Sequence, residues 1–161
     1  MKIAIVVISY TGNTKQVSIL LEEALKAASH EVTLIPLETI PNNPNVTMLT
    51  LKEVPSLEGY EGVILGSPVH GFMPSYAMKT FIKETPSFSG KIVFPYVTHA
   101  FPFAWMGGSG AVGTMKKQVL AKGGQVSLTQ VINWGRKNRD VVVATMIQSC
   151  VQLFNNSKQD E

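Results

Sequence analysis

The segment "SYTGNTKQ" (residues 9–16) combines small polar residues with one glycine. Ser9, Thr11 and Thr14 carry hydroxyl groups, and Gly12 permits a tight turn of the backbone. The apolar run "IAIVVI" before this segment predicts a buried strand, and the amphipathic pattern after it predicts a helix. Free N–H groups at the start of a helix bind phosphates. These residues therefore predict a phosphate-binding loop whose donors are electrically neutral.

Other well-known phosphate loops differ from this segment in residue type. The nucleoside-triphosphate pattern GxxxxGK[ST] is absent from the sequence. The dinucleotide pattern GxGxxG occurs once, as "GSGAVG" (residues 108–113), but no acidic residue follows it about 20 residues later. A receiver domain needs acidic residues after its first strand, and a cysteine-dependent phosphatase needs a cysteine in the loop; neither is present there. A simpler interpretation stays open, in which the Ser, Thr and Asn side chains only cap the helix.

Strand and helix patterns alternate along the chain. Apolar and β-branched runs predict five strands, at residues 3–8, 31–35, 62–66, 91–98 and 125–132. Helical periodicity predicts helices at residues 13–28, 75–83, 111–122 and 140–154. The stretch 36–59 contains four prolines, and within it only residues 46–53 are expected to form a short helix.

This alternation predicts an α/β fold of one domain, residues 1–155, with a frayed tail at residues 156–161. The expected architecture is a three-layer α/β/α sandwich around a five-stranded parallel sheet of order 2-1-3-4-5. Ligands bind such sheets beyond the carboxyl ends of the strands. Three loops, at residues 9–14, 67–73 and 98–110, are expected to meet at that edge.

Composition excludes several classes of protein. No apolar run is long enough to span a bilayer, so no membrane span is expected. The single cysteine, Cys150, excludes an internal disulfide or a thiolate metal cluster, and the expected location is a reducing cytoplasm. The periodicity of the last helix directs Cys150 inward, which predicts a core residue rather than a nucleophile.

Basic residues are unevenly distributed along the chain, whose net charge is +3. Residues 85–139 contain no acidic residue but seven basic ones: Lys91, Lys116, Lys117, Lys122, Arg136, Lys137 and Arg139. This stretch is either a solvated face or a docking surface for an anionic partner. No nucleic-acid recognition motif accompanies the charge, so nucleic acid is not an expected partner.

Three segments resemble the flavin loops of one superfamily. "SYTGNTKQ" resembles the FMN-phosphate loop of flavodoxins, [ST]-x-T-G-x-T. "GSPVHGFMPSYAMKTFI" resembles the loop after the third strand of flavodoxin-like proteins. "VTHAFPFAWMGGSGAVGTMKKQVLAKGGQV" resembles their glycine-rich third flavin loop with its helix. The segments occur in the family's order, and the resemblance spans nearly the whole chain.

The resemblance implies FMN as the cofactor and assigns residues to its site. The phosphate loop would consist of Ser9, Tyr10, Thr11, Gly12, Asn13 and Thr14. One side of the flavin ring would be flanked by Pro68, Val69, His70, Gly71 and Phe72. The other side would be lined by Thr98, His99, Ala100, Gly107 and Gly108, with Trp105 the first choice among the aromatic residues that could stack on the ring. No metal ligand or catalytic residue is assigned.

The expected function is electron transfer through FMN, with a redox protein as the partner. An NAD(P)H-dependent FMN or quinone oxidoreductase is the alternative, in which Arg136, Lys137 and Arg139 would bind the nicotinamide nucleotide. A second alternative is a non-redox interaction module with the same fold. Flavodoxins are typically acidic, whereas this chain has a predicted pI of about 9.0. Some similar domains adjoin ferredoxin modules, but this chain lacks the cysteines of a ferredoxin, so an iron–sulfur partner would be a separate chain. The oligomeric state stays open.

Overall fold

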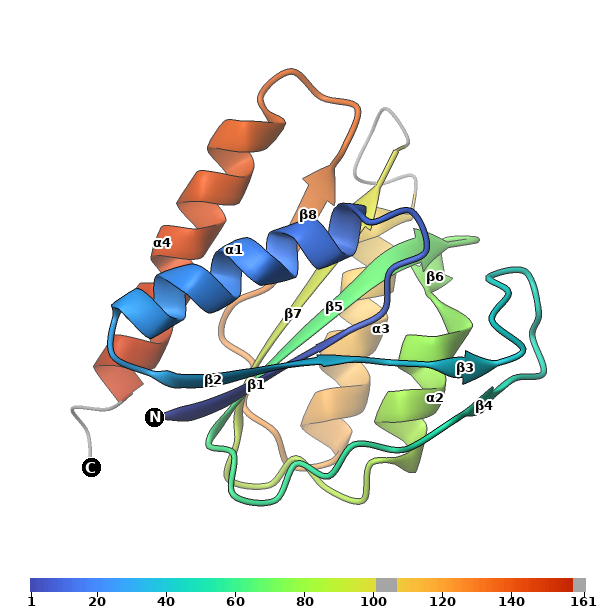
Figure 1. Ribbon diagram of the computed structural model, residues 1–161, viewed down its shortest axis with the longest axis horizontal. Helices are drawn as coiled ribbons and strands as arrows, with labels where there is room; N and C mark the ends of the chain where they lie inside the picture. The colour runs from blue at the N-terminus through green and yellow to red at the C-terminus, as the bar shows by residue number, and fades with distance from the viewer. Residues whose placement is uncertain (101–106, 158–161) are drawn as a thin grey trace.

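The computed structural model describes residues 1–100 and 107–157 of the chain (Figure 1). Five parallel strands lie in the order β2-β1-β5-β7-β8. Their bounds are β1 (Lys2–Val7), β2 (Glu31–Pro36), β5 (Gly62–His70), β7 (Ile92–His99) and β8 (Gln130–Asn133). Counted along the parallel strands alone, this is the predicted order 2-1-3-4-5.

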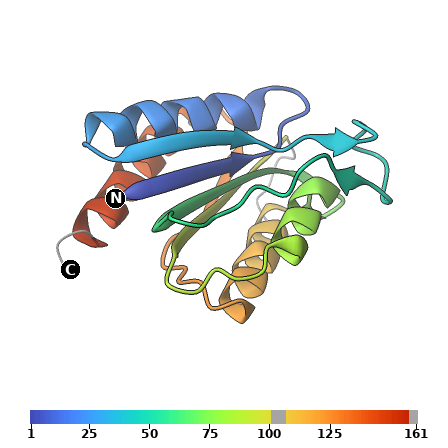
Figure 2. The ribbon, with the colours of Figure 1, turned by 60° about the horizontal axis from the view of Figure 1, so that its bottom comes forward.

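Helices cover both faces of the sheet, which confirms the predicted three layers (Figure 2). Helices α1 (Asn13–Ala27) and α4 (Arg139–Ser157) cover one face. Helices α2 (Tyr76–Glu84) and α3 (Gly108–Ala121) cover the other. Because each helix connects parallel strands or follows the last one, the helices begin near the carboxyl edge of the sheet, where the predicted loops lie.

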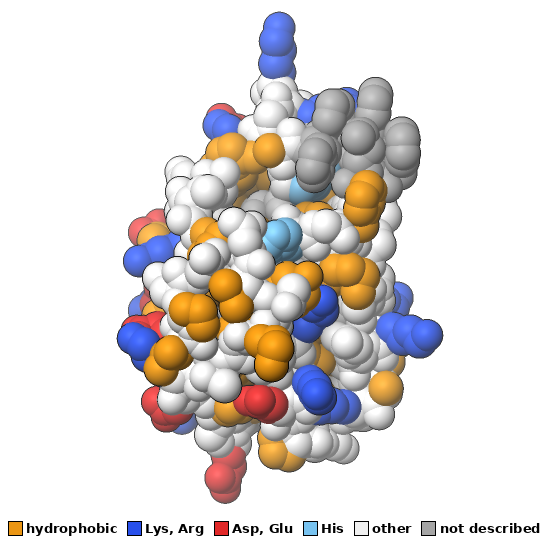
Figure 3. All heavy atoms as spheres, turned by 90° about the vertical axis from the view of Figure 1, so that its right-hand side faces the viewer, with side chains coloured by type: hydrophobic (Ala, Val, Ile, Leu, Met, Phe, Trp, Pro, Cys, Tyr) orange, Lys and Arg blue, Asp and Glu red, His pale blue; other side chains and the backbone are white. Residues whose placement is uncertain are grey.

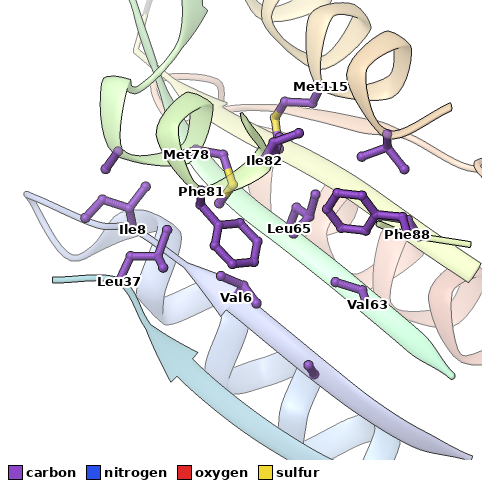
Figure 4. Packing of buried hydrophobic residues seen from close by; sticks show 14 of the residues in the cluster. Val6, Ile8, Leu37, Val63, Leu65, Met78, Phe81, Ile82, Phe88 and Met115 are labelled. Atoms are coloured by element: carbon purple, nitrogen blue, oxygen red, sulfur yellow. The ribbon is translucent and has the colours of Figure 1, made fainter. Parts of the chain in front are cut away.

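Alternating residues of the strands supply two separate cores. Val6 of β1 and Leu65 of β5 face α2 and α3, where they pack under Phe81 and Met115 (Figure 4). On the opposite face the core contains residues from both covering helices, among them Leu21, Met146, Cys150 and Phe154. Cys150 is fully buried and burial raises its thiol pKa, so it is a core residue as predicted.

The predicted loop at residues 67–73 is wrong in its first half. Strand β5 continues to His70 and forms a tight antiparallel hairpin with β6 (Met73–Pro74). Pro68 has no backbone N–H to donate, which disfavours its place inside a strand. Its carbonyl nevertheless accepts a hydrogen bond from the Ser75 backbone N–H at 3.2 Å, so the strand continues through it.

The predicted short helix at residues 46–53 is also wrong. This part of the chain instead contains an antiparallel pair, β3 (Thr39–Ile40) and β4 (Thr50–Leu51). Lys52 closes the pair, since its backbone N–H donates to the Glu38 carbonyl at 2.9 Å and its ammonium lies 2.6 Å from the Glu38 carboxylate. Leu51 packs against the core under α2, a long-range contact that outweighs a weak local preference for helix.

Most other element bounds differ from the prediction by one residue, and three elements differ by more. Strand β8 begins at Gln130 rather than Gln125, which forms only an isolated bridge with Ile92. Helix α3 begins at Gly108 rather than Ala111, so residues 108–110 are helical rather than part of the predicted loop. Helix α4 continues to Ser157 and includes two residues, 156 and 157, of the predicted tail.

Candidate functional site

The first loop leads into the N-terminus of α1, which lies at the carboxyl edge of the sheet and has no side-chain cap. Gly12 precedes the helix in a left-handed conformation, with φ of 94°, and no side chain caps the helix. The first intrahelical bond runs from the Gln16 N–H to the Gly12 carbonyl at 2.9 Å, so the preceding N–H groups of the first turn lack helical acceptors. Ser9 accepts from the Gly12 N–H at 3.1 Å. The simple capping interpretation therefore fails, and the donors are available to an anion.

Thr14 points inward rather than toward solvent. It is only 2% exposed, and its hydroxyl lies 2.8 Å from the hydroxyl of Thr98 at the end of β7. This contact joins the first and third predicted loop segments. Thr11 is exposed and Ser9 is partly exposed, so both side chains are accessible to solvent at the start of α1.

A buried hydrogen-bond network holds the first turn of α1 from below. The Tyr96 hydroxyl donates to the Thr14 carbonyl at 2.9 Å and lies 2.6 Å from the Ser18 hydroxyl. A Cβ atom at Gly66 would come 2.5 Å from the Tyr96 hydroxyl, so the strand needs glycine there to admit this ring. Burial raises the pKa of Tyr96, so its hydroxyl stays protonated and remains a donor. This network was not predicted from sequence.

The second predicted segment forms a pinned hairpin. Pro68, Val69 and His70 lie on β5, and Gly71 and Phe72 form its turn, with positive φ values of 54° and 65°. Two positive φ values are typical of a type I′ turn. The Ser75 backbone N–H donates to the Ser67 hydroxyl at 3.0 Å, and the Ser75 hydroxyl caps α2 by accepting from the Met78 N–H at 3.2 Å.

Phe72 is the exposed tip of this hairpin. Its side chain is 61% exposed, although it is a large apolar residue. Its left-handed backbone conformation is unusual for a bulky side chain and costs on the order of 1–2 kcal/mol. The turn therefore presents an aromatic ring at the site's rim at an energetic cost to the fold.

The third predicted segment packs directly against this hairpin. Gly107 precedes α3 with φ of 115°, and a Cβ atom there would lie 3.0 Å from both Phe72 Cα and Val69 Cγ1. At Gly108 a Cβ atom would overlap Val131 of β8. Both glycines thus permit close approach of α3 to its neighbours. Ala100 is exposed beside them, whereas Trp105, with Phe101 and Phe103, lies outside the described residues.

His99 is a buried imidazole at the end of β7. It is 6% exposed, and neither ring nitrogen has a hydrogen-bond partner in the described part of the chain. Burial lowers its pKa, so the ring is neutral at pH 7. A Cβ atom on Gly108 would lie 3.2 Å from its Nε2, which places the ring against the first turn of α3. An unpartnered buried group costs about 1–3 kcal/mol, and a ligand at this edge could supply the missing partner.

Tyr10 is oriented away from the other residues of the phosphate loop. Its side chain packs against the core cluster and lies beside Thr39 on β3. Burial raises the pKa of Tyr10, and the neighbouring Thr39 side chain opposes that shift. Tyr10 therefore ties the β3–β4 pair to the first loop.

The predicted basic stretch divides into structural and surface residues. The Lys122 ammonium donates to the carbonyls of Ile82, Lys83 and Thr85 at 2.6–2.7 Å, and that of Lys91 donates to the Tyr60 carbonyl at 2.7 Å. Arg139 stacks on Trp134 at 4.6 Å and pairs with Asp140 at 3.1 Å. The stretch is therefore not one uniform docking face.

Other candidate sites are not supported within residues 1–100 and 107–157. No group of three or more His, Cys, Asp or Glu side chains there is arranged to hold a metal ion. None of the helices described in that part of the chain has the length and apolarity needed to cross a membrane. A wide hollow of about 640 Å³ lies at the opposite end of the molecule, where Leu57, Glu84 and Lys91 line it, and contains none of the predicted site residues.

The described loops meet where the strand order reverses, between β1 and β5. Their residues suit a phosphate-bearing ligand: an uncapped helix N-terminus with hydroxyl donors, glycines that allow close approach, and an imidazole without a partner among the described residues. The structure thus brings the three predicted segments together, apart from residues 101–106.

Comparison with known proteins identifies the class of fold. No protein-family model and no curated protein matches the chain in sequence. Among solved structures, two-electron reduced Megasphaera elsdenii flavodoxin is 19% identical, with a TM-score of 0.69 over 93% of this chain and 98% of that chain. FMN-bound Fusobacterium nucleatum flavodoxin is 19% identical, with a TM-score of 0.67 over 97% of this chain and 98% of that chain. The chain therefore has the flavodoxin-like fold.

The same fold also occurs in these comparisons as part of a larger protein. The flavodiiron core of Flv1 from Synechocystis sp. PCC6803 is 14% identical, with a TM-score of 0.72. The match covers 100% of this chain but 37% of that chain. The fold is thus similar both to whole flavodoxins and to one portion of a flavodiiron core.

Proposed function

We propose that this protein binds FMN at the carboxyl edge of its sheet and transfers electrons through it. The observation that carries the proposal is the N-terminus of α1, where unbonded N–H groups follow the left-handed Gly12 and no side chain caps them. The first turn also contains no acidic residue that would repel a phosphate. The flavodoxins of the same fold, one of them solved with FMN, support this choice of ligand.

Each part of the site would have a separate task. The N–H groups of Asn13 and its two successors, with the Ser9 and Thr11 hydroxyls, would hold the phosphate. The β5–β6 hairpin and Gly107 would flank the flavin ring. FMN itself supplies reversible one- and two-electron chemistry when bound. The chain's own contribution is to orient the ring, limit the access of water and hold His99 neutral beside it.

Titration of the apoprotein with FMN tests the proposal. Thr11→Ala removes one hydroxyl donor to a charged phosphate, which is worth about 1.5–3 kcal/mol and corresponds to roughly 10- to 150-fold weaker binding. Thr47→Ala, which alters an exposed threonine elsewhere, is the matched control and should bind FMN like the wild type. Equal affinity of the Thr11→Ala variant and the wild type would contradict the assignment.

Riboflavin separates the phosphate contacts from the ring contacts. It lacks the phosphate, so calorimetry should show much weaker binding than for FMN, and Thr11→Ala should not weaken riboflavin further. Matching affinities for the two ligands would show that ring contacts dominate. No binding of either ligand would remove the flavin proposal and leave the non-redox module.

A second candidate function, an NAD(P)H-dependent FMN or quinone oxidoreductase, is favoured by one feature. A small hollow of about 200 Å³ beyond β8 is lined by two arginines and two asparagines: Asn133, Arg136, Asn138 and Arg139. Arginine binds phosphates through paired donors. Steady-state oxidation of NADPH with a quinone acceptor would select this function, and Arg136→Gln should then raise the KM for NADPH.

A further inference from the structure

The helix N-termini gather positive potential at the cofactor edge. In a parallel α/β fold each helix directs its positive dipole end toward the carboxyl ends of the strands. Proteins commonly place acidic residues in such first turns. Helices α1, α2 and α3 have none, and the one acidic residue in the first turn of α4, Asp140, pairs with Arg139. The dipoles at this edge are therefore largely uncompensated.

Basic side chains around the same edge add to this potential. Lys15 is exposed in the first turn of α1, and Lys79 lies near the start of α2 with its ammonium 4.2 Å from the centre of the Tyr76 ring. Arg136 and Lys137 are exposed in the turn between β8 and α4. That turn adjoins the end of β7, since a Cβ atom on Gly135 would lie 3.6 Å from the Ala100 carbonyl. We call Lys15, Lys79, Arg136 and Lys137 the basic rim.

Most described carboxylates lie away from the basic rim. Glu31, Glu61 and Glu84 stand at the start of β2, before β5 and at the end of α2, which is the amino edge of the sheet. At the carboxyl edge, Glu38 pairs with Lys52 at 2.6 Å, beside Glu53 on the β3–β4 side. Figure 3 views this edge: red side chains lie along its left-hand border, with blue ones among them, and at its lower end, and further blue ones lie near the grey segment and on the right-hand side. Among the described residues, the candidate site therefore carries few carboxylates of its own.

An exposed aromatic residue lies within this positive region. Phe72 is 61% exposed at the hairpin tip and contacts the Gly107 backbone region, so it borders the site directly. Interfaces commonly bind through a central aromatic residue surrounded by charges that steer the partner. Phe72 has a left-handed backbone conformation, and strained conformations of this kind cluster at functional sites.

From this arrangement we infer that the cofactor edge docks an acidic electron-carrier protein, with Phe72 as the apolar contact and the basic rim as the steering charge. The inference rests on the proposed function, because the partner would meet the edge at which FMN is held. The basic rim would orient an acidic partner before contact and disfavour a basic one. The positive charge of the basic rim is opposite in sign to the acidic surface that is typical of flavodoxins.

Binding titrations of the FMN-loaded protein with two carriers of opposite charge test this inference. The probes are an acidic [2Fe–2S] ferredoxin and basic cytochrome c, each measured by calorimetry at low and at high salt. We expect binding of the ferredoxin alone, weakened at least about 10-fold between 20 and 300 mM salt, because screening acts over about 10 Å. Preferred binding of cytochrome c, or equal binding of both, would overturn the inference.

Two matched double variants locate the surface. Lys79→Glu with Lys137→Glu reverses two charges of the basic rim and should weaken ferredoxin binding by at least about 10-fold at low salt. Lys83→Glu with Lys117→Glu makes the same change in net charge away from the rim, in the last turn of α2 and on the outer side of α3, and should change the affinity much less. Equal effects of the two double variants would show that net charge alone, not a surface, governs binding.

The apolar contact has its own variant. Phe72→Asn suits the left-handed turn, so the protein should fold. Because Phe72 also borders the proposed flavin site, the variant is measured with FMN at saturation, and under that condition it should weaken ferredoxin binding. Unchanged ferredoxin binding would remove Phe72 from the interface. Failure of the wild-type protein to bind FMN would refute the proposed function. If the wild type binds FMN but shows no preference between the two carriers, only the docking inference is refuted. Salt-sensitive binding of RNA in preference to ferredoxin would overturn it as well.

Discussion

His99 combines burial with a polar ring that has no partner in the described part of the chain. Because burial lowers its pKa, the folded protein binds a proton at this ring only below the range in which the unfolded chain does so. The unfolded state therefore holds more protons than the folded state as the pH falls below about 6.5. Stability contributed by the neutral ring is present above that pH and is lost toward acid.

This sign predicts a specific acid sensitivity. The free energy of unfolding should fall between pH 7 and pH 5, with a slope from His99 of at most about 1.4 kcal/mol per pH unit. His99→Leu should show a smaller fall over the same range, whatever its stability at pH 7. Urea denaturation at several pH values measures both slopes, and parallel curves would contradict the prediction.

Tyr96 makes a second prediction at the residue scale. Tyr96→Phe removes a buried hydroxyl that bonds the Thr14 carbonyl and the Ser18 hydroxyl, so it should destabilise the protein by about 1–3 kcal/mol. Tyr60→Phe is the control, since the Tyr60 ring lies beside Lys2 and its hydroxyl makes no hydrogen bond within the described residues. The shift of the urea midpoint measures the loss, and similar midpoints for the two variants would argue against the network.

At the scale of elements, a lysine after the end of α3 caps the C-terminal end of α2. Lys122 follows α3 and donates to three carbonyls at the C-terminus of α2. The last carbonyls of a helix have no N–H partner within that helix. A hydrogen bond from a charged donor is worth about 1.5–3 kcal/mol. This contact joins α2 and α3 at the amino edge, opposite the candidate site.

Lys122→Met should therefore destabilise the protein by about 1–3 kcal/mol, because three carbonyls lose their charged donor. Lys117→Met, on the exposed side of the same helix, should stay within about 0.5 kcal/mol of the wild type. Thermal and urea unfolding measure the difference. FMN affinity should not change in either variant, since both positions lie away from the cofactor edge.

For the whole molecule, ligand binding and folding are linked. A ligand that binds only the folded state stabilises it by about 2.7 kcal/mol when its free concentration is 100 times its Kd. FMN at that excess should raise the unfolding free energy by this amount in the wild type. At the same FMN concentration Thr11→Ala should gain less, and riboflavin should stabilise both proteins equally. A melting temperature that does not respond to FMN would refute specific binding to the folded state.

Much of the whole molecule followed from local pattern. Continuous apolar strands and amphipathic helices specify a parallel sheet covered on both faces, because only that arrangement buries them all. The first loop was also predictable, since Gly12 and its hydroxyl neighbours directly precede a strong helical pattern. The first half of the "GSGAVG" segment, residues 108–110, was placed in a loop because glycine disfavours helix, whereas close packing against β8 and His99 accompanies a helix here.

The amino-acid sequence was thus sufficient for the fold class, the strand order and the segments that form the candidate site. It was not sufficient for contacts between residues far apart in the chain. The inward turn of Thr14 toward Thr98, the Tyr96 network and the burial of His99 depend on how β7 lies beside α1 and α3. Periodicity encodes which face of an element is buried, but a hydrogen bond across 84 positions exists only once the sheet has brought its two partners together.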